Sequence, residues 1–339
     1  MKDRAAVQKK TVPVPTSEIY FLEKPAGFST LDIKDLPQDK REAIRLLHRR
    51  NDKHNIRILV FFAIWAVAGV ASLTVDLLAV QVLSCLLITC AIIGCTVLVH
   101  EASHNLLFQN PTVNRWLGLL CGLPVLVSVT GFRTNHGFHH VRRGSYGESS
   151  EWKAPPRVDA TSVPKYILSI IVGAYGFLTA LPVIAMTHAQ GTTRRKTLAE
   201  YALIVGVFAF VFSAFPMEAI LKMWFFPMIL AAHLTEFRAV AEHGLTTRGN
   251  VFTATRTVVS NRVISFVMCN INYHLEHHLF PGVPWYNLPK VHRLLRDEYR
   301  EAGSSVYPSY MRFCIDFFKV IWSGLLPNAR LIPVEARQH

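Results

Sequence analysis

The chain has 339 residues, of which 51% are hydrophobic and only 17% are charged, and its mean hydropathy is +0.26. This composition is more apolar than that of an ordinary soluble enzyme. A hydrocarbon core of about 30 Å needs roughly 20 apolar residues in a helix, and the sequence contains several such segments. We therefore predict an all-α integral membrane protein.

The net charge of +13 is concentrated in part just before the first apolar segment. The basic residues there are Lys40, Arg41, Arg45, Arg49, Arg50, Lys53 and Arg57. Positive charge beside a span is typical of a cytoplasmic flank, so it sets topology and does not indicate nucleic-acid binding. We predict a cytoplasmic N-terminal region over residues 1–55. The six cysteines contain no CxxC pair, which argues against a thiolate metal site or a disulfide scaffold.

The first apolar segments, residues 58–75 and 77–99, are interrupted only by Asp76 and predict a spanning hairpin. The next, residues 116–132, is short and contains three glycines and a proline, so we expect it to dip into the bilayer without crossing.

Three further apolar segments follow at residues 166–187, 201–217 and 223–234, of which the last is too short to cross alone. Downstream, four apolar residues at helical spacing predict an amphipathic helix against the membrane surface. They are Leu288, Val291, Leu294 and Leu295. We predict a membrane domain over residues 56–300 and a cytoplasmic tail over residues 301–339.

Histidines form short groups of regular spacing. HEASH places His100 and His104 one turn apart directly after the second span. HGFHH supplies His136, His139 and His140, and HLEHH supplies His274, His277 and His278, each with the spacing i, i+3, i+4. On a helix, each group directs its imidazoles from one face.

Eight imidazoles exceed the four ligands of a tetrahedral zinc site, so two metal ions are the economical number. Imidazole suits zinc, copper, iron and nickel. Of these, two irons beside a membrane could bind O2 and cycle between oxidation states, which indicates oxidation of an apolar substrate.

The pattern HxxxH, HxxHH, HxxHH resembles the three histidine boxes of the membrane fatty acid desaturase and hydroxylase superfamily, over residues 58–296. The segment HHLFP after the third box is similar to the desaturase branch. The resemblance implies a di-iron centre, with O2 as co-substrate, that introduces a double bond into a fatty acyl chain.

The resemblance also implies a ninth ligand, His243 in AEHGL. Glu101 and Glu276, inside the boxes, are expected to orient ligand rings; Glu242 and Glu236 are weaker candidates. The substrate would be an acyl-lipid, an acyl-CoA or an acyl-carrier species. A separate electron donor of ferredoxin or cytochrome type is expected, and a nucleic-acid partner is not.

All boxes must lie on one side of the membrane, so we expect about four spans and a cytoplasmic helical cap that carries the site, in a bacterial inner membrane. Residues 166–187 would then cross, and only one of the two later segments would cross back completely. Arg194, Arg195 and Lys196 disagree with this arrangement, because it places them outside.

Three alternatives remain. A hydroxylase of a lipid or another hydrophobic substrate would share the same site. HEASH alone matches the zinc metalloprotease signature HExxH, but this leaves both HxxHH boxes without a role. A transporter would place its histidines along the spans and not after them. Chain length, bond position and bond geometry do not follow from the sequence.

Overall fold

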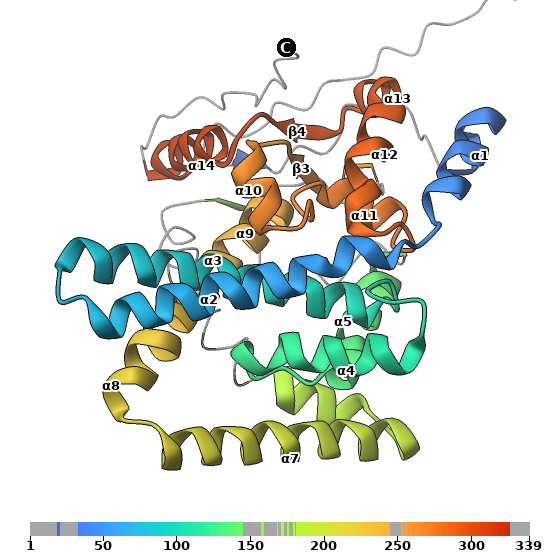
Figure 1. Ribbon diagram of the computed structural model, residues 1–339. Coiled ribbons are helices and arrows are strands. Elements are labelled where there is room, and N and C mark those ends of the chain that lie inside the picture. Colours follow the sequence, from blue (N-terminus) through green and yellow to red (C-terminus); the bar gives the residue numbers. More distant parts are fainter. Residues whose placement is uncertain are drawn as a thin grey trace, which may run out of the picture.

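The computed structural model describes residues 33–144, 181–244 and 255–325, the short segments 19–20, 157–158 and 252–253, and scattered positions between 168 and 179. These residues are mainly helical (Figure 1). The α-helices are α1 (Gln38–Leu47), α2 (Arg57–Thr74), α3 (Leu78–Ser103), α4 (Pro111–Gly122), α5 (Val129–Gly144), α7 (Gly191–Ala214), α8 (Met217–Ile220), α9 (Phe226–His243), α10 (Arg262–Val267), α11 (His274–Leu279), α12 (Leu288–Leu294), α13 (Arg296–Glu301) and α14 (Tyr310–Leu325).

Shorter elements connect them. The 3-10 helices are η1 (Ile33–Asp35), η2 (Asp52–Ile56), η3 (Leu123–Val125) and η5 (Trp285–Asn287), and η4 (Leu221–Phe225) is a π-helix between α8 and α9. Strand β1 (Ile19–Tyr20) pairs antiparallel with β2 (Arg157–Val158). Strand β3 (Arg256–Val258) pairs parallel with β4 (Ser305–Tyr307).

The predicted first hairpin is confirmed by α2 and α3, which pack along each other. The ring of Phe61 rests directly on Gly94, where any side chain would collide with it. Phe61 is thereby buried between the helices. At the tip, the Gln81 side-chain amide donates hydrogen bonds to the carbonyls of Ser72 (2.8 Å) and Val75 (2.7 Å). The tip is therefore closed by polar contacts within the hairpin.

A second pair of long helices is formed by α7 and the continuous run from α8 to α9. The indole of Trp65 donates to the Met223 carbonyl (2.7 Å), and the Thr89 hydroxyl to the Pro227 carbonyl (3.3 Å). The start of this run therefore lies beside the middle and tip of the hairpin, and α9 then extends alongside α3. With α2 and α3, these segments are four helical candidates for membrane spans among the described residues, so the predicted class is confirmed.

The membership of the four spans differs from our expectation. The segments 201–217 and 223–234 fall mainly in candidate spans of 24 and 27 residues, Gly191–Ala214 and Met217–His243. Both helices are therefore long and apolar enough to cross, whereas we expected only one of the two segments to cross completely. The apolar run 223–234 is too short to cross alone, but its helix continues through more polar turns at both ends, from Met217 to His243. Much of the segment 166–187 lies outside the described residues; its end, 181–188, is helical and leads into α7.

This arrangement also removes the disagreement over Arg194, Arg195 and Lys196. Gly131 in α5 lies against Thr197 in α7, because a Cβ atom added at Gly131 would be 3.1 Å from the Thr197 side chain. Thr197 directly follows the three basic residues. The same α5 turn packs through Val129 on Gly118, which rests on Ala102 near the end of α3. The basic residues at the start of α7 therefore lie at the same end of the helices as the first histidine box.

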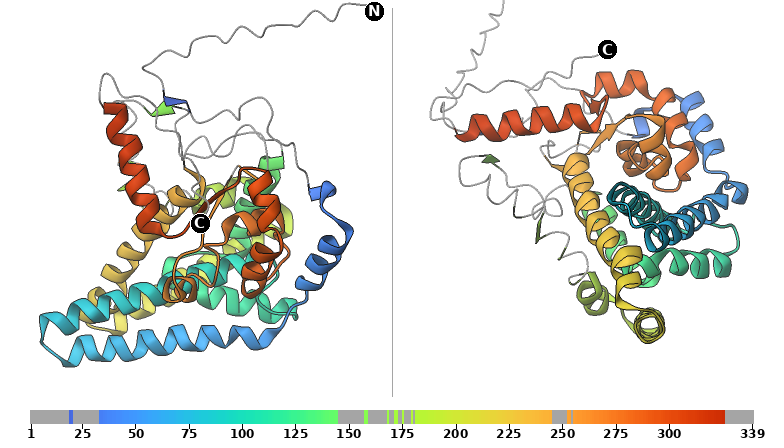
Figure 2. Two further views of the ribbon diagram at one scale, coloured as in Figure 1. Left: turned by 90° about the horizontal axis from the view of Figure 1, so that it is seen from above. Right: turned by 60° about the vertical axis from the view of Figure 1, so that its left-hand side comes forward.

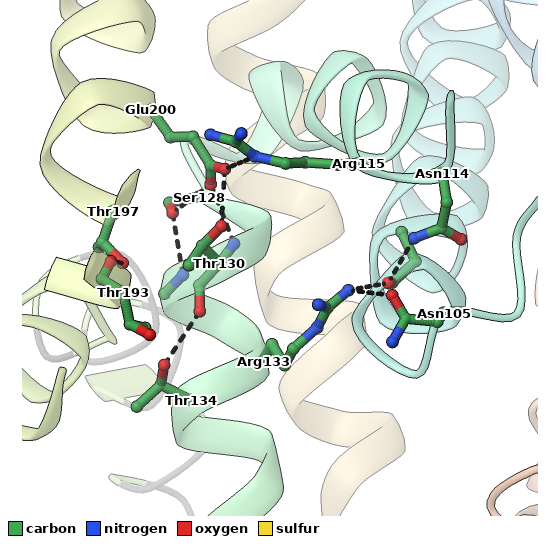
Figure 3. A network of polar contacts seen from close by, with 12 residues as sticks. Asn105, Asn114, Arg115, Ser128, Thr130, Arg133, Thr134, Thr193, Thr197 and Glu200 are labelled. Atoms are coloured by element: carbon green, nitrogen blue, oxygen red, sulfur yellow. Dashed lines mark hydrogen bonds and ion pairs between the residues drawn. The ribbon is translucent and has the colours of Figure 1, made fainter. Parts of the chain in front are cut away.

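The segment that we expected to dip into the bilayer lies in α4, η3 and the start of α5. The chain bends by 90° between residues 111–125 and residues 129–137. The buried carboxylate of Glu200 in α7 holds the bend (Figure 3). It accepts hydrogen bonds from the Ser128 hydroxyl (2.7 Å), from the Thr130 amide (2.9 Å) and hydroxyl (2.7 Å), and from Arg115 Nε (2.7 Å). The start of α5, two turns before the second histidine box, is thus fixed to α7.

The C-terminal elements α10 to α13 and the β3–β4 pair form a cap beside the ends of α3 and α9 (Figure 1). The interpretation of residues 288–295 as a membrane-surface helix is wrong. Leu288, Val291 and Leu295 are completely buried in the main core, and α12 packs against α1, α11 and η5. The periodicity marked a buried face correctly, but the face meets protein and not lipid.

The Glu200 contacts predict a large effect of Glu200→Ala. Arg115 would lose its partner, and the Ser128 and Thr130 donors would be left without their acceptor, at a cost of roughly 2–4 kcal/mol in the free energy of unfolding. Thermal unfolding of the purified protein in detergent measures the change. Glu218→Ala is the matched control, because Glu218 makes an exposed ion pair with Lys222 one turn away (2.6 Å) and should hardly shift the transition. Equal shifts in the two variants would contradict this account.

Candidate metal centre

The first group of histidines joins three elements. It consists of His100 and His104 from the end of α3, His136 from α5 and His277 from α11, and one ring nitrogen of each lies within 4.8 Å of the others. The Nε2 atoms of His104 and His136 are 3.0 Å apart. The ring centroid of His100 lies 4.4 Å from that of His277 and 4.5 Å from that of His136.

The end of α3 is shaped so that its two histidines point together. His100 lies in the last turn, His104 is the C-cap residue, and Asn105 follows in the left-handed conformation (φ 59°) that commonly ends a helix. Arg133 from α5 donates hydrogen bonds to the carbonyls of Ser103 (2.8 Å) and Ala102 (2.9 Å). It also donates to the side-chain oxygen of Asn105 (2.7 Å), and Figure 3 shows these two residues side by side. The guanidinium thus caps the helix and neutralises the negative end of its dipole.

Arg133 also affects the protonation of the site. Burial, together with the positive charge of Arg133, lowers the pKa of His104 from its ordinary value to about 4. The imidazole is therefore neutral near pH 7, and a neutral ring keeps the lone pair that a metal ion requires.

The second group consists of His243 at the end of α9 and His274 and His278 from α11. The Nε2 atom of His274 lies 2.8 Å from that of His243 and 2.9 Å from that of His278. His243 and His274 are buried. His243, which the sequence suggested only through family resemblance, thus joins two members of the third box.

Both groups meet on α11, a helix of six residues with the sequence HLEHHL. His277 belongs to the first group, whereas His274 and His278 belong to the second. The ring centroids of His277 and His278 are 5.4 Å apart, and those of His274 and His277 are 5.7 Å apart. The two groups are therefore neighbours, bridged by one short helix.

The donors fit a pair of metal ions. In each group, ring nitrogens from separate elements lie within 4.8 Å of one another with little exposure, an arrangement that a metal ion bound by their lone pairs stabilises. Imidazole is the common ligand of iron, zinc and copper. Seven of the nine expected ligands are brought together; His139 and His140 lie in α5, but their side chains are outside the described residues. The six cysteines are free, as expected.

Buried carboxylates stand behind the histidines. Glu242 accepts two hydrogen bonds from Arg238 Nη1 (2.8 and 2.9 Å), and its Oε2 lies 3.4 Å from His274 Nδ1. Such a carboxylate fixes the orientation of a ligand ring and raises its basicity. Glu242, which we ranked below Glu101 and Glu276, is therefore a strong candidate for this role.

Glu101 connects the first box to the cap. Its side chain is completely buried, its Oε1 lies 3.5 Å from His100 Nδ1, and its Oε2 accepts a hydrogen bond from the backbone amide of Trp285 (3.2 Å). The carboxylate thus lies between a candidate ligand and η5, the element that follows the third box.

Glu276 has a different environment from the one we expected. Its Oε1 lies 2.6 Å from His292 Nδ1 on α12, and its Oε2 accepts a hydrogen bond from the Thr257 hydroxyl on β3. The carboxylate therefore anchors α11 to α12 and β3, its neighbours within the cap. Sequence reasoning missed His292, which lies outside the boxes; its only signal is that a histidine occupies an otherwise basic helix, which is weak.

The Glu276 contacts predict that His292→Ala loosens the third box. The variant leaves a buried carboxylate without its main donor, and we expect metal affinity to fall about 10–100-fold, the usual effect of losing a ligand-supporting contact. Competition with a chelator, followed by metal analysis of the protein, measures it. His188→Ala changes an exposed histidine just before α7 and should leave retention unchanged. Identical retention in both variants would show that His292 does not support the site.

The comparisons with known proteins agree with this geometry. A family model described as fatty acid desaturase matches residues 76–310, which is more than half of the chain. The sphingolipid delta(4)-desaturase/C4-monooxygenase DES2 of Homo sapiens is 28% identical over 246 residues, covering 70% of this chain and 71% of its own. The sphingolipid delta(4)-desaturase DES1 of Drosophila melanogaster is 28% identical over 229 residues, covering 65% of this chain and 66% of its own. A sphingolipid delta(4)-desaturase of Komagataella phaffii is 26% identical over 236 residues, covering 65% of this chain and 62% of its own. The chain therefore belongs to the fatty acid desaturase family and is a membrane desaturase-type oxidoreductase with a lipid substrate.

Proposed function

We propose that this protein is an O2-dependent di-iron desaturase that introduces a double bond into the aliphatic chain of a sphingolipid. The observation that carries the di-iron proposal is the pair of adjoining imidazole groups joined through α11. The names of the similar proteins from Homo sapiens and Drosophila melanogaster support the substrate class.

Each group of histidines would hold one iron. His100, His104, His136 and His277 would bind the first, and His243, His274 and His278 the second. His139 and His140, in the same helix as His136, would complete the nine ligands. Bound iron would supply the activation of O2, while the role of the chain is to hold neutral imidazoles in place and to exclude water. Glu101 and Glu242, close to His100 and His274, would orient those two rings.

The charge distribution supports an active site on the cytoplasmic face. A group of basic residues precedes α2, and Arg194, Arg195 and Lys196 lie in the first turns of α7. Both groups lie at the end of the spans where the histidines gather. Positive charge concentrates on the cytoplasmic side of membrane proteins. The similar proteins named above come from animals and a yeast, so they do not support the bacterial inner membrane that we expected.

Hydroxylation is the second candidate function, because the Homo sapiens relative is named both desaturase and C4-monooxygenase. The two reactions differ in whether a second hydrogen leaves the substrate or oxygen is added, and the outcome depends on small differences in substrate position. A zinc metalloprotease has less support. Its general base would be Glu101, which is completely buried and bonded to the Trp285 amide.

The function is tested by supplying a bacterial host that expresses the protein with a saturated sphingolipid and with saturated fatty acids. Mass spectrometry should show a sphingolipid product lighter by two hydrogens; a product heavier by one oxygen would indicate hydroxylation. A product in the acyl lipids alone would move the substrate class away from sphingolipids. His277→Ala should abolish product and reduce bound iron, because it removes a buried ligand at the bridge between the groups.

The control for that experiment is His233→Gln. The His233 ring interacts with the Ile229 carbonyl in its own helix (2.8 Å) and belongs to neither imidazole group. Product formation and iron content should remain close to those of the wild type. Full turnover by His277→Ala would overturn the ligand assignment, and purified active protein without iron would overturn the di-iron proposal.

We further propose that a separate electron donor with an acidic surface docks on the basic residues of α1 and the following turn. Arg41, Arg45, Arg49 and Lys53 are exposed there, and Arg50 reaches the loop after the first box, where it donates to the Asn105 carbonyl (2.8 Å). This surface therefore lies close to the first imidazole group. Complementary charge steers such encounters and accelerates association.

Charge reversal tests the docking surface. Arg45→Glu combined with Arg49→Glu should raise the donor concentration needed for half-maximal turnover several-fold and make it less dependent on salt, with iron content unchanged. Arg194→Glu combined with Arg195→Glu reverses two exposed charges at the start of α7 and is the matched control. An equal effect of both pairs would indicate a general charge effect, and turnover without any reductant would refute the need for a donor.

A further inference from the structure

Helix α14 has three distinct faces. One face packs into the protein: Phe313 and Phe317 are buried in a small core with Val240, Val258 and Tyr307. A second face is polar and carries Arg312, Asp316 and Lys319, of which Arg312 and Asp316 form an ion pair (3.1 Å). These two faces would suffice for a helix that lies between protein and water.

The third face is apolar and exposed. Met311, Ile315 and Phe318 are 70%, 43% and 62% exposed, and their spacing i, i+4, i+7 places them within an arc of roughly 60°. This arc lies between the buried face and the polar face. We call these three side chains the α14 stripe. A continuous exposed stripe of large apolar side chains indicates contact with something other than water.

The position of α14 points to the membrane. The ring of Phe313 lies 6.2 Å from that of Phe237 on α9, and Phe237 precedes His243 by six residues, or about 9 Å along the helix. One turn earlier, Leu234 on α9 is 42% exposed, as expected of a side chain that faces lipid. Helix α14 therefore contacts a candidate span close to the end at which the histidines gather.

The direction of α14 agrees with this position. Both views in Figure 2 show that α14 runs across the direction of α2 and α3 and not along it. If α2 and α3 cross the bilayer, α14 runs roughly parallel to the bilayer surface. Helices of this kind bury their apolar face about 5–10 Å into the boundary between headgroups and acyl chains, with cationic residues on the polar side.

We propose that α14 is an interfacial helix whose stripe, Met311, Ile315 and Phe318, inserts into the cytoplasm-facing boundary of the bilayer. The polar face then lies at the level of the headgroups, where Lys319 can meet lipid phosphate. A second copy of the chain is a poorer occupant, because three side chains expose a few hundred Å² at most and a stable protein interface needs about 1,000 Å². The proposal does not depend on the reaction that the enzyme catalyses.

For the enzyme, an inserted stripe would fix the distance between the cap and the bilayer surface. The core beneath α14 includes Val240 and Ala241, which directly precede Glu242 and His243 in the chain. Strand β4 ends at Tyr307, three residues before α14 begins, and its partner β3 carries Thr257, which holds Glu276. Insertion of the stripe would thus tie the second imidazole group to the bilayer surface.

Photo-crosslinking of the full chain in lipid nanodiscs tests the proposal. A benzophenone amino acid is placed singly at position 311, 315 or 318, with Arg312 as the matched position on the same helix and Arg45 on α1 as an exposed control. Val70, 59% exposed on α2, serves as a lipid-facing positive control. After illumination, mass spectrometry should find lipid adducts at the three stripe positions and at position 70 in several-fold higher yield than at 312 and 45.

A second measurement uses the unmodified protein, so that it does not depend on the folding of any variant. Phospholipid with a diazirine in its acyl chain should label the stripe residues and leave Arg312 unlabelled. Adducts between two protein chains at the stripe would show that a second copy covers it and would overturn the proposal. Stripe yields as low as those at 312 and 45 would do the same, because the stripe would then face water.

Discussion

The structure depends on one constraint: imidazoles from four separate segments must reach the same place at the same end of the membrane helices. Each pair of spans therefore leaves from and returns to the histidine end. Helix α3 arrives there with the first box, and α9 arrives with His243. The bent α4–α5 segment starts near that end and brings His136 to within 3.0 Å of His104. A segment that crossed completely between these two boxes would separate them by the thickness of the bilayer.

Buried carboxylates make this gathering of histidines possible. Two cations surrounded only by neutral rings carry a large uncompensated charge, and nearby carboxylates reduce it. Glu101 joins α3 to η5 through the Trp285 amide, and Glu276 joins α11 to α12 through His292. Glu242 pairs with Arg238 in its own helix α9 and lies 3.4 Å from His274 on α11. These side chains would compensate the charge of bound cations, and Glu101 and Glu276 also fix the relative positions of the elements that they join. Glu200 has a related role at a distance, because it ties the start of α5 to α7.

The spacing of the histidines carried most of the information about the site. Residues three and four positions apart on a helix must share a face, so each box could be read without a structure. How the boxes divide into two groups could not be read, because His277 and His278 are adjacent in sequence and yet belong to different groups. His292 and Arg133 were missed for a similar reason, since their roles arise only from contacts between distant segments. The misplaced surface helix shows a further limit: periodicity identifies the apolar face of α12 but not whether protein or lipid covers it.

Because α11 contributes rings to both groups, the offset between its own rings in the two groups is set within a helix of six residues, whereas His100, His104 and His243 are positioned by the long spans. Long spans tilt and shift when the thickness of the bilayer changes. Such movements would rotate or displace α11 as a rigid piece, while the offset between His277 and its neighbours His274 and His278 stays that of a single helical turn. In membranes of varied lipid content, the three α11 rings would in this way keep a constant spacing from one imidazole group to the other.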